Sequence, residues 1–289
     1  MTNQNNRRSL GNLILAMSIF GTIGILRKYV QMPSTFIALF RAIIGTGFLW
    51  VILRLRKQPL DLSAIKRDLI LLILSSTAMA FNWIFLFEAY NYTTVTTATL
   101  CYYMAPTIMV VASHFLFGED LGLKKLLCVA AALLGMVLIS GVVGSGIPSP
   151  SELKGILFGL AAALLYACVI LINKKIRLES AYDRTILQLG IASIVLIPYT
   201  LLTADMSTAI FDPMGIIFLI LIGMVHTGFA YSLYFGSVKD LPTRTVALMS
   251  YIDPILAIVL SALILREPMG LEEIIGSAMI LGAAYISEK

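Results

Sequence analysis

The stretch that decides the fold is FNWIFLFEAYNYTTVTTATLCYYMAPTIMVVASHFLFGEDLGL at residues 81–123, which recurs in changed form as FAYSLYFGSVKDLPTRTVALMSYIDPILAIVLSALILREPMGL at residues 229–271. A shift of 148 positions aligns the two stretches without gaps, with 11 identities in 43 positions. The identities include two prolines and two glutamates, which match as Pro106 with Pro254 and Glu119 with Glu267. An apolar composition produces matches between hydrophobic residues, but not matches of this kind. The chain is therefore predicted to carry an internal duplication.

Composition predicts an all-α integral membrane protein. The chain is 59% hydrophobic and 13% charged, with a mean hydropathy of +0.92, far from the values of soluble domains. A bilayer core needs roughly 20 apolar residues per helix, and backbone groups inside it must be satisfied within the segment. Ten transmembrane helices are predicted, at 11–30, 35–53, 69–90, 95–117, 124–142, 155–173, 185–203, 214–235, 244–265 and 271–287.

The basic residues orient the chain. The net charge is +5, and with the N-terminus inside, 16 Lys and Arg fall on the inner side and 4 on the outer side. This asymmetry is the positive-inside pattern, which predicts cytoplasmic termini in a prokaryotic cell membrane. It also explains the basic excess without a nucleic-acid partner.

The two halves are predicted to be inverted five-helix repeats, because an odd number of crossings reverses the direction of the second half. The loop 143–152, rich in Gly, Ser and Pro, is the natural joint between them. We expect the first repeat at 1–145 and the second at 146–289, in one integrated membrane domain. A rocking of one half against the other is a hypothesis that follows from this architecture.

A family resemblance rests on residues spread through both halves. They are Phe81-Asn82-Trp83, Glu88-Ala89-Tyr90, Thr97-Ala98, Pro106, Gly118-Glu119 and Gly135, echoed by Tyr234-Phe235, Ala247, Pro254, Glu267, Gly276 and Gly282. With these residues the chain resembles the EamA family of the drug/metabolite transporter superfamily over essentially its whole length. The resemblance implies a ten-helix carrier of small organic solutes. Members move amino acids, other metabolites, nucleotide-linked compounds or drugs, so the substrate is not named. A duplicated membrane chain also favours a solute site between the halves.

Asp253 is the most informative polar residue of the ninth predicted span. A charge near the bilayer centre costs about 2.5–3.5 kcal/mol on insertion scales and usually faces a cavity or a partner. Pro254 supplies no N–H and is expected to free the carbonyl of Ser250. The functional interpretation is a proton acceptor or a contact for a substrate cation. The structural interpretation is a hydrogen bond between helices.

His226 is placed at a similar depth in the eighth span. Its neutral pKa range suits proton coupling, but a single histidine is also commonly a satisfied packing residue. Together with Asp253 it makes coupling to protons a hypothesis, while a facilitative carrier or an exchanger needs neither residue to titrate.

A polar and aromatic stripe in the third, fourth and ninth spans is the candidate pocket lining. Pro106 is expected to free the carbonyl of Tyr102, as Pro254 does in the other half. Such a lining suits a zwitterionic or cationic solute with an apolar part, and helix packing with an aromatic belt is the alternative. The residues are Asn82, Trp83, Thr99, Tyr102, Tyr103 and Tyr251.

Four charged residues are candidate gates. Arg41 and Glu88 both fall in the outer third of the membrane, where an ion pair between them would reduce the cost of burial. The alternatives are an outer gate or a contact between Arg41 and a substrate carboxylate. Glu119 and Glu267 end the fourth and ninth spans at opposite faces, and we expect helix-end or gate contacts for both.

Other chemistries find no support in the sequence. It lacks HExxH, GxSxG, a P-loop and a dinucleotide fingerprint, so an enzyme and a receptor are remote alternatives and no cofactor is expected. The cysteines Cys101, Cys128 and Cys168 are odd in number and fall inside spans, which favours packing over a disulfide or a metal site. Amino acids and related solutes are the first expectation for the substrate, and lipophilic cations, as in a multidrug exporter, are the second. The direction of transport and the choice between monomer and homodimer stay open.

Overall fold

The computed structural model describes residues 2–55, 57, 62–117, 122–139, 148–173, 175–176, 180–205, 207, 209–238, 241, 249–267 and 269–287. Regular structure in these ranges is helical throughout. The first half contains α1 (Thr2–Gly21), α2 (Ile23–Lys28), α3 (Ser34–Leu55), α4 (Leu62–Tyr92), α5 (Val95–Tyr102), α6 (Ala105–Phe117) and α7 (Leu123–Ile139). The second half contains α8 (Pro150–Asn173), α9 (Ala181–Thr203), α10 (Pro213–Leu221), η2 (Ile222–Phe229), α11 (Ala230–Val238), α13 (Ile252–Leu260), η3 (Ser261–Leu265) and α14 (Leu271–Ser287).

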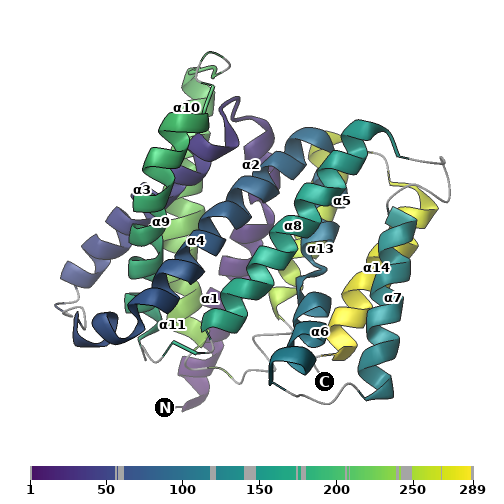
Figure 1. The fold of residues 1–289 in the computed structure, drawn as a ribbon, viewed down its shortest axis with the longest axis horizontal. Coiled ribbons are helices and arrows are strands. Elements are labelled where there is room, and N and C mark those ends of the chain that lie inside the picture. The colour runs from purple at the N-terminus through teal and green to yellow at the C-terminus, as the bar shows by residue number, and fades with distance from the viewer. Residues whose placement is uncertain are drawn as a thin grey trace.

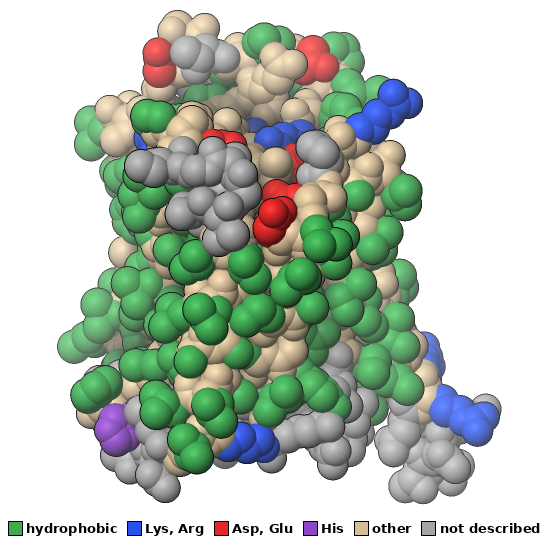
Figure 2. Space-filling view, turned by 90° about the vertical axis from the view of Figure 1, so that its right-hand side faces the viewer, with side chains coloured by type: hydrophobic (Ala, Val, Ile, Leu, Met, Phe, Trp, Pro, Cys, Tyr) green, Lys and Arg blue, Asp and Glu red, His purple; other side chains and the backbone are tan. Residues whose placement is uncertain are grey.

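The helices form a bundle that matches the expected multi-pass membrane protein. Within the described residues, each of the ten predicted spans falls on helical chain. Six helical stretches there are long and apolar enough to cross a membrane: Arg7–Lys28, Ser34–Leu55, Lys66–Tyr92, Pro150–Asn173, Tyr182–Thr203 and Pro213–Tyr234. Hydrophobic side chains cover the middle of the face in Figure 2, and charged side chains gather toward its two ends. That distribution suits a protein surrounded by lipid.

We call the end of the bundle at which α1 begins and α14 ends the proximal end, and the opposite end the distal end (Figure 1). At the distal end, α2, α4 and α9 end and α3, α5 and α10 begin. The counterpart of α1 in the second half is α8, which begins at the distal end and so runs the opposite way. The two halves are therefore inverted relative to each other. The expected boundary at 145/146 lies outside the described residues and stays a prediction.

Packing between the halves follows the same symmetry. α4 packs on α8, and its counterpart η2–α11 packs on α1. α3 packs on η2, and its counterpart α9 packs on α4. α3 and α9 pack on each other, as do α7 and α14. Each contact thus has a partner obtained by exchanging the halves, as an inverted duplication predicts. The interface between the halves is therefore the centre of the molecule.

Three predicted helices are interrupted, which corrects their expected continuity. The first is broken by a turn at Thr22, and the fourth by a turn at Tyr103 and Met104. The described part of the ninth turns at Tyr251, the residue that aligns with Tyr103. Broken helices therefore occupy equivalent places in the two halves, the arrangement that many transporters use at their solute sites.

The two helix-break prolines lie in the first turn of a new helix rather than inside a continuous one. Pro106 is the second residue of α6, and Pro254 is the third residue of α13. Backbone N–H groups of a first turn have no partner inside the helix, so a proline there costs little. The prolines were expected to free one carbonyl each within a continuous helix. Instead, the helix is interrupted just before each proline.

Two segments of the second half adopt the wider π-helical geometry, η2 and η3. η2 is the middle of the eighth predicted span and holds both His226 and Thr227. η3 ends at Arg266, whose φ of 54° is left-handed and terminates the helix. Single π turns inside transmembrane helices commonly mark functional positions, which draws attention to η2.

Candidate solute site between the two halves

A hydrogen bond between the two halves joins the two helix interruptions. The hydroxyl of Tyr103, directly after α5, donates to Oδ2 of Asp253 in the first turn of α13, with an O–O distance of 2.9 Å. Both side chains are partly buried. The backbone carbonyl of Asp253 lies against Gly21 of α1, where a Cβ atom would come within 2.7 Å of it. Asp253 is therefore enclosed by both halves of the chain.

Arg41 of α3 is the buried cation of the interface. Its side chain is 5% exposed, and its Nε donates a 2.7 Å hydrogen bond to Oγ1 of Thr227 in η2. The guanidinium lies over the ring of Trp83, with Cζ 4.2 Å from the ring centroid. Thr227 in turn donates to the carbonyl of Ile222, 3.2 Å away and five residues earlier in the π-helix. These contacts hold the guanidinium in a fixed orientation on an aromatic surface.

The close approach that makes this contact possible depends on a glycine. A Cβ atom on Gly45 would come within 2.4 Å of Cγ2 of Thr227. Since such a distance is sterically forbidden, any larger residue would push η2 away from α3. Gly45 thus sets the distance between Arg41 and its partner.

The expected ion pair between Arg41 and Glu88 is not formed. In the described part of the chain, the ion pair found within 4.0 Å is that of Arg67 with Asp68. The carboxylate of Glu88 instead accepts a 3.2 Å hydrogen bond from Nδ2 of Asn91. The pairing fails because Arg41 turns toward η2 of the second half, whereas Glu88 lies at the distal end of α4. A buried guanidinium without an anion nearby is costly, so Arg41 is a candidate contact for an anionic group of a solute.

Two phenols link the surroundings of the two charges. Tyr90 and Tyr102 are each close enough to interact electrostatically with both Arg41 and Asp253. Tyr102 also stacks at a tilt on Tyr166 of α8, at 5.3 Å between ring centroids. Aromatic rings with polar tips thus lie within electrostatic range of both charged groups, and the pocket lining expected from the sequence stays a prediction.

Asn82 and His226 make contacts that are satisfied inside the protein. Asn82 is 2% exposed, and its Nδ2 donates to the carbonyl of Ala162 in α8 at 2.6 Å. His226 Nε2 lies 2.8 Å from Oγ1 of Thr22, and that hydroxyl donates to the carbonyl of Ile19 at 2.7 Å. The other ring nitrogen, Nδ1, lies 3.4 Å from the carbonyl oxygen of Leu221. This arrangement favours a structural role for both residues, as tethers between the halves.

The two remaining lining candidates are Thr99 and Tyr251. Thr99 is buried within α5, and Tyr251 packs edge-to-face on Tyr285 of α14, at 6.1 Å between ring centroids. Their part in a pocket stays a prediction.

Glu267 joins the two halves at the distal end. Its carboxylate accepts hydrogen bonds from the backbone N–H of Val95 at 2.9 and 3.0 Å and from that of Thr96 at 3.4 Å. A carboxylate is favoured at this place because the N-terminus of α5 has unpaired N–H groups and positive potential. Ser261 also donates to it. The expected helix-end contact of Glu267 is therefore present, whereas Glu119 lies outside the described residues.

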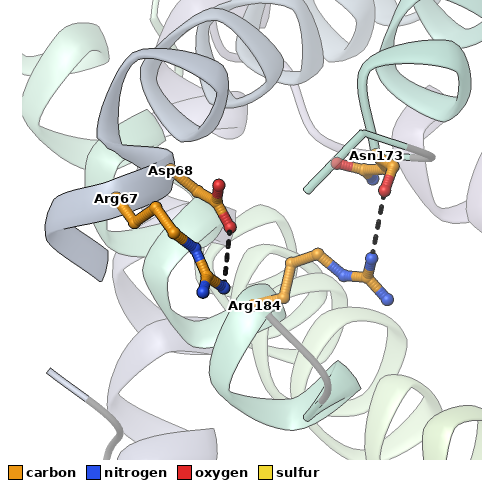
Figure 3. Close-up of polar contacts among 4 residues, drawn as sticks. All are labelled: Arg67, Asp68, Asn173 and Arg184. Atoms are coloured by element: carbon orange, nitrogen blue, oxygen red, sulfur yellow. Dashed lines mark hydrogen bonds and ion pairs between the residues drawn. The ribbon is translucent and has the colours of Figure 1, made fainter. Parts of the chain in front are cut away.

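A second polar cluster ties α4 to α8 and α9 near the proximal end. Figure 3 places Asn173 and Arg184 across from Arg67 and Asp68. Arg184 donates to the carbonyl of Asn173 at 3.4 Å, and Arg67 approaches Asp68 at 3.9 Å. The side chain of Asn173 accepts from both Ser75 at 2.9 Å and Gln188 at 2.8 Å. These contacts bind the second half to the first at the end opposite Glu267.

Thr227 and Gly45 belong to the contacts of Arg41, although neither was a candidate residue from the sequence. Thr227 was identifiable as a neighbour of His226, but periodicity indicates the face of a helix and not the partner across it. Gly45 had no local signal, because its role depends on a helix from the other half. In the described ranges, no group of three or more His, Cys, Asp or Glu could hold a metal ion.

Comparison with known proteins agrees with the fold and the duplication. The profile of the EamA-like transporter family matches twice, at residues 8–141 and 153–288. An uncharacterized transporter of Bacillus subtilis, YxxF, is 31% identical over 280 residues, which cover 95% of this chain and 88% of the relative. A Salmonella typhimurium protein named as a probable amino-acid metabolite efflux pump is 26% identical over 189 residues, 60% of each chain. A solved crystal structure superimposes with a TM-score of 0.66 at 18% identity, covering 96% of this chain and 95% of the other.

Proposed function

Because the chain belongs to the EamA-like transporter family, we propose that it carries small zwitterionic metabolites, amino acids first among them, by alternating access. The family consists of transporters rather than enzymes, so the solute passes through chemically unchanged. The observation that carries the proposal is that two groups of opposite charge lie at the interface between the halves, and Tyr90 and Tyr102 interact electrostatically with both. Arg41 is the cation and Asp253 is the carboxylate.

A zwitterion complements these two groups. Its carboxylate would accept from the guanidinium of Arg41, which offers planar, bidentate donors. Its ammonium would donate to Asp253, and its apolar part would lie among the rings of Tyr90, Tyr102 and Trp83. The relative in Salmonella, named as a probable amino-acid metabolite efflux pump, supports the same class of substrate.

Lipophilic cations are the second candidate, and the position of Arg41 disfavours them. The guanidinium covers the face of Trp83, which a cationic drug would otherwise use. It also repels a second positive charge in a medium of low dielectric constant. A cation exporter would thus have to displace Arg41 from its aromatic surface.

Alternating access follows from the symmetry of the packing. Because each contact between the halves has a counterpart, the two halves can exchange conformations around a fixed central site. The tethers at the distal end (Glu267) and near the proximal end (Asn173) lie on opposite sides of that site. One of them would open in each state. We place both termini in the cytoplasm of the cell, from the distribution of basic residues.

Coupling to protons is a hypothesis attached to Asp253. Tyr103 gives this carboxylate one hydrogen bond, and a proton or a substrate ammonium would satisfy it further. The variant Asp253→Asn keeps the size of the side chain and removes the titration. A coupled carrier should then lose the dependence of uptake on a pH gradient, and an unchanged dependence would remove Asp253 from the coupling mechanism.

The proposed function is tested by binding and uptake with one panel of solutes. Purified protein in detergent would be screened by thermal shift at about pH 6 and about pH 8 against amino acids, nucleosides, polyamines and lipophilic cations. A compound that binds the folded state raises the apparent melting temperature by mass action. We expect shifts from amino acids, followed by their uptake in proteoliposomes. Shifts and uptake confined to lipophilic cations would overturn the proposal.

A further inference from the structure

A cavity of about 490 Å³ opens at the distal end, away from the charges of the central site. It lies between the end of α2, the end of α4 and the segment that follows α9. Its polar lining includes Arg27, Lys28, Glu88, Asn91 and Asp205. Sites for small molecules commonly measure about 300–1,000 Å³, so the cavity is large enough for an amino acid and several waters.

Arg27 gives this cavity a fixed and incompletely satisfied cation. Its side chain is 4% exposed, and its terminal nitrogens donate to the carbonyl of Val30 at 2.8 Å, to Ser34 at 3.0 Å and to Asn91 at 3.0 Å. The Nε of Arg27 has no hydrogen-bond partner, and no carboxylate within the described residues approaches to 4.0 Å. A buried donor without a partner is costly. A solute carboxylate in the cavity would offset part of this cost through its attraction to the guanidinium charge.

Lys28 adds a second positive charge at the same end. Its Nζ donates one hydrogen bond, to the carbonyl of Thr93 at 3.2 Å, and an ammonium has three donors. Two donors thus remain for an anion or for water.

Carboxylates complete the lining with the opposite sign. Glu88 interacts electrostatically with Arg27 without forming an ion pair, and it accepts from Asn91 at 3.2 Å. Asp205 lies in the segment beyond α9, outside the spans, where hydrogen bonds from Ser207 hold its pKa below the usual range. Asp205 therefore stays ionised at neutral pH. Both signs of charge face one space, as the two ends of a zwitterion require.

We propose that this cavity is a second solute site, which binds the carboxylate of an amino acid at Arg27 and Lys28 and its ammonium at Glu88. The inference rests on the proposed function and adds an outer subsite to it. Tyr90 lines the cavity and also interacts electrostatically with Arg41 and Asp253 of the central site. Tyr90 thus lies at the wall of the outer cavity and within electrostatic range of the central charges.

The test counts binding sites with L-leucine, by isothermal titration of the purified full chain. We expect two L-leucine molecules per chain. Glu88→Gln and Lys28→Gln should each weaken the outer site at least about tenfold, since each removes a charged partner of the solute. The same variants should leave the second binding event intact. Arg41→Gln should instead weaken the central binding event and leave the outer one intact.

Lys154→Gln is the matched control, because Lys154 is also a distal lysine, bonded to the hydroxyl of Tyr92 at 2.8 Å, and does not line the cavity. The Lys154→Gln variant should keep both L-leucine binding events. Uptake of L-leucine with a single binding event, removed by Arg41→Gln and unaffected by Glu88→Gln, would overturn the outer subsite and leave the proposed function standing. Absence of both binding and uptake for the whole amino-acid panel would overturn the proposed function and the subsite with it.

Discussion

The hydroxyl of Tyr103 and the carboxylate of Asp253 are hydrogen bonded at 2.9 Å, although the two residues belong to opposite halves of the chain. Tyr103 stands at the interruption between α5 and α6, and Asp253 follows the equivalent interruption at Tyr251. The contact thus joins the two broken helices where their backbones are irregular. Irregular backbone at membrane depth is tolerated where it is enclosed by protein or lines a cavity. The contact between Tyr103 and Asp253 therefore marks the place where we propose that solute binds.

Removing that hydrogen bond should impair transport while leaving the fold intact. Tyr103→Phe deletes one hydroxyl and leaves Asp253 without its donor, a loss of about 1.5–3 kcal/mol for a bond to a charged group. We expect at least about a tenfold fall in kcat/KM for amino-acid uptake in proteoliposomes. Tyr29→Phe, at an exposed tyrosine that packs on Phe218, is the control and should have no effect. Equal uptake by Tyr103→Phe and wild type would show that the bond is not used.

Arg41 should not tolerate replacement by lysine. Lysine keeps the charge but loses the planar donors and the stacking on Trp83, so we expect uptake to fall at least about tenfold. Arg54 offers a matched control, because it lies over the exposed Trp50, with Cζ 4.9 Å from the ring centroid. Arg54→Lys should transport normally. If the two variants behave alike, the position of Arg41 between the halves has no special role.

The crossing of α7 and α14 should be sensitive to a single methyl group. A Cβ atom on Gly135 would come within 2.7 Å of the carbonyl oxygen of Gly276, and the converse distance is also 2.7 Å. Gly135→Ala should therefore destabilise the protein by about 1–3 kcal/mol through overpacking, seen as a lower melting temperature. Gly282 of α14 has no atom within 4 Å of its Cβ position. Gly282→Ala should be neutral or stabilising, by up to about 1 kcal/mol, and destabilisation there would contradict the packing.

Glu267 should hold the distal ends of the two halves together. Glu267→Gln weakens the cap on α5 by about 0.5–2 kcal/mol and should favour the state that is open at the distal end. A cysteine at the buried position Thr96 would then react faster with a membrane-impermeant maleimide. Glu273→Gln is the control, since Glu273 caps α14 through the N–H of Gly270 at 2.7 Å within one half. Unchanged labelling in Glu267→Gln would argue against a gate.

The sequence predicted the helices well because each depends on local composition. Long apolar runs produce membrane helices wherever backbone groups have no water to bond, so the spans could be assigned without knowledge of their neighbours. The duplication added the inversion and the equivalence of Tyr103 with Tyr251. The π-helical geometry around His226 had no comparable signal, since it arises where η2 packs against α3 and α1.

The site could be predicted only as far as the types of its residues. Asp253, Tyr103 and Trp83 were proposed as lining residues because polar and aromatic groups inside the membrane are conspicuous. Their partners were not predicted, and the ion pair weighed for Arg41 and Glu88 is not formed in the described part of the chain. Depth in the membrane can be read from the sequence, but the direction of a long side chain depends on which helix lies opposite, here η2 of the other half.

The central claim is that Arg41 and Asp253 recognise the two charges of one zwitterion. The most direct measurement compares the affinities of L-leucine, its decarboxylated amine and N-acetyl-L-leucine for wild type, Arg41→Gln and Asp253→Asn. Wild type should bind L-leucine at least about tenfold more tightly than either analogue, from about 1.5–3 kcal/mol per charged hydrogen bond. At the central site, measured with the outer subsite weakened by Glu88→Gln, Arg41→Gln should abolish the preference over the amine, and Asp253→Asn the preference over the N-acetyl acid. If wild type binds the amine as tightly as L-leucine, or if both variants keep both preferences, the account is contradicted.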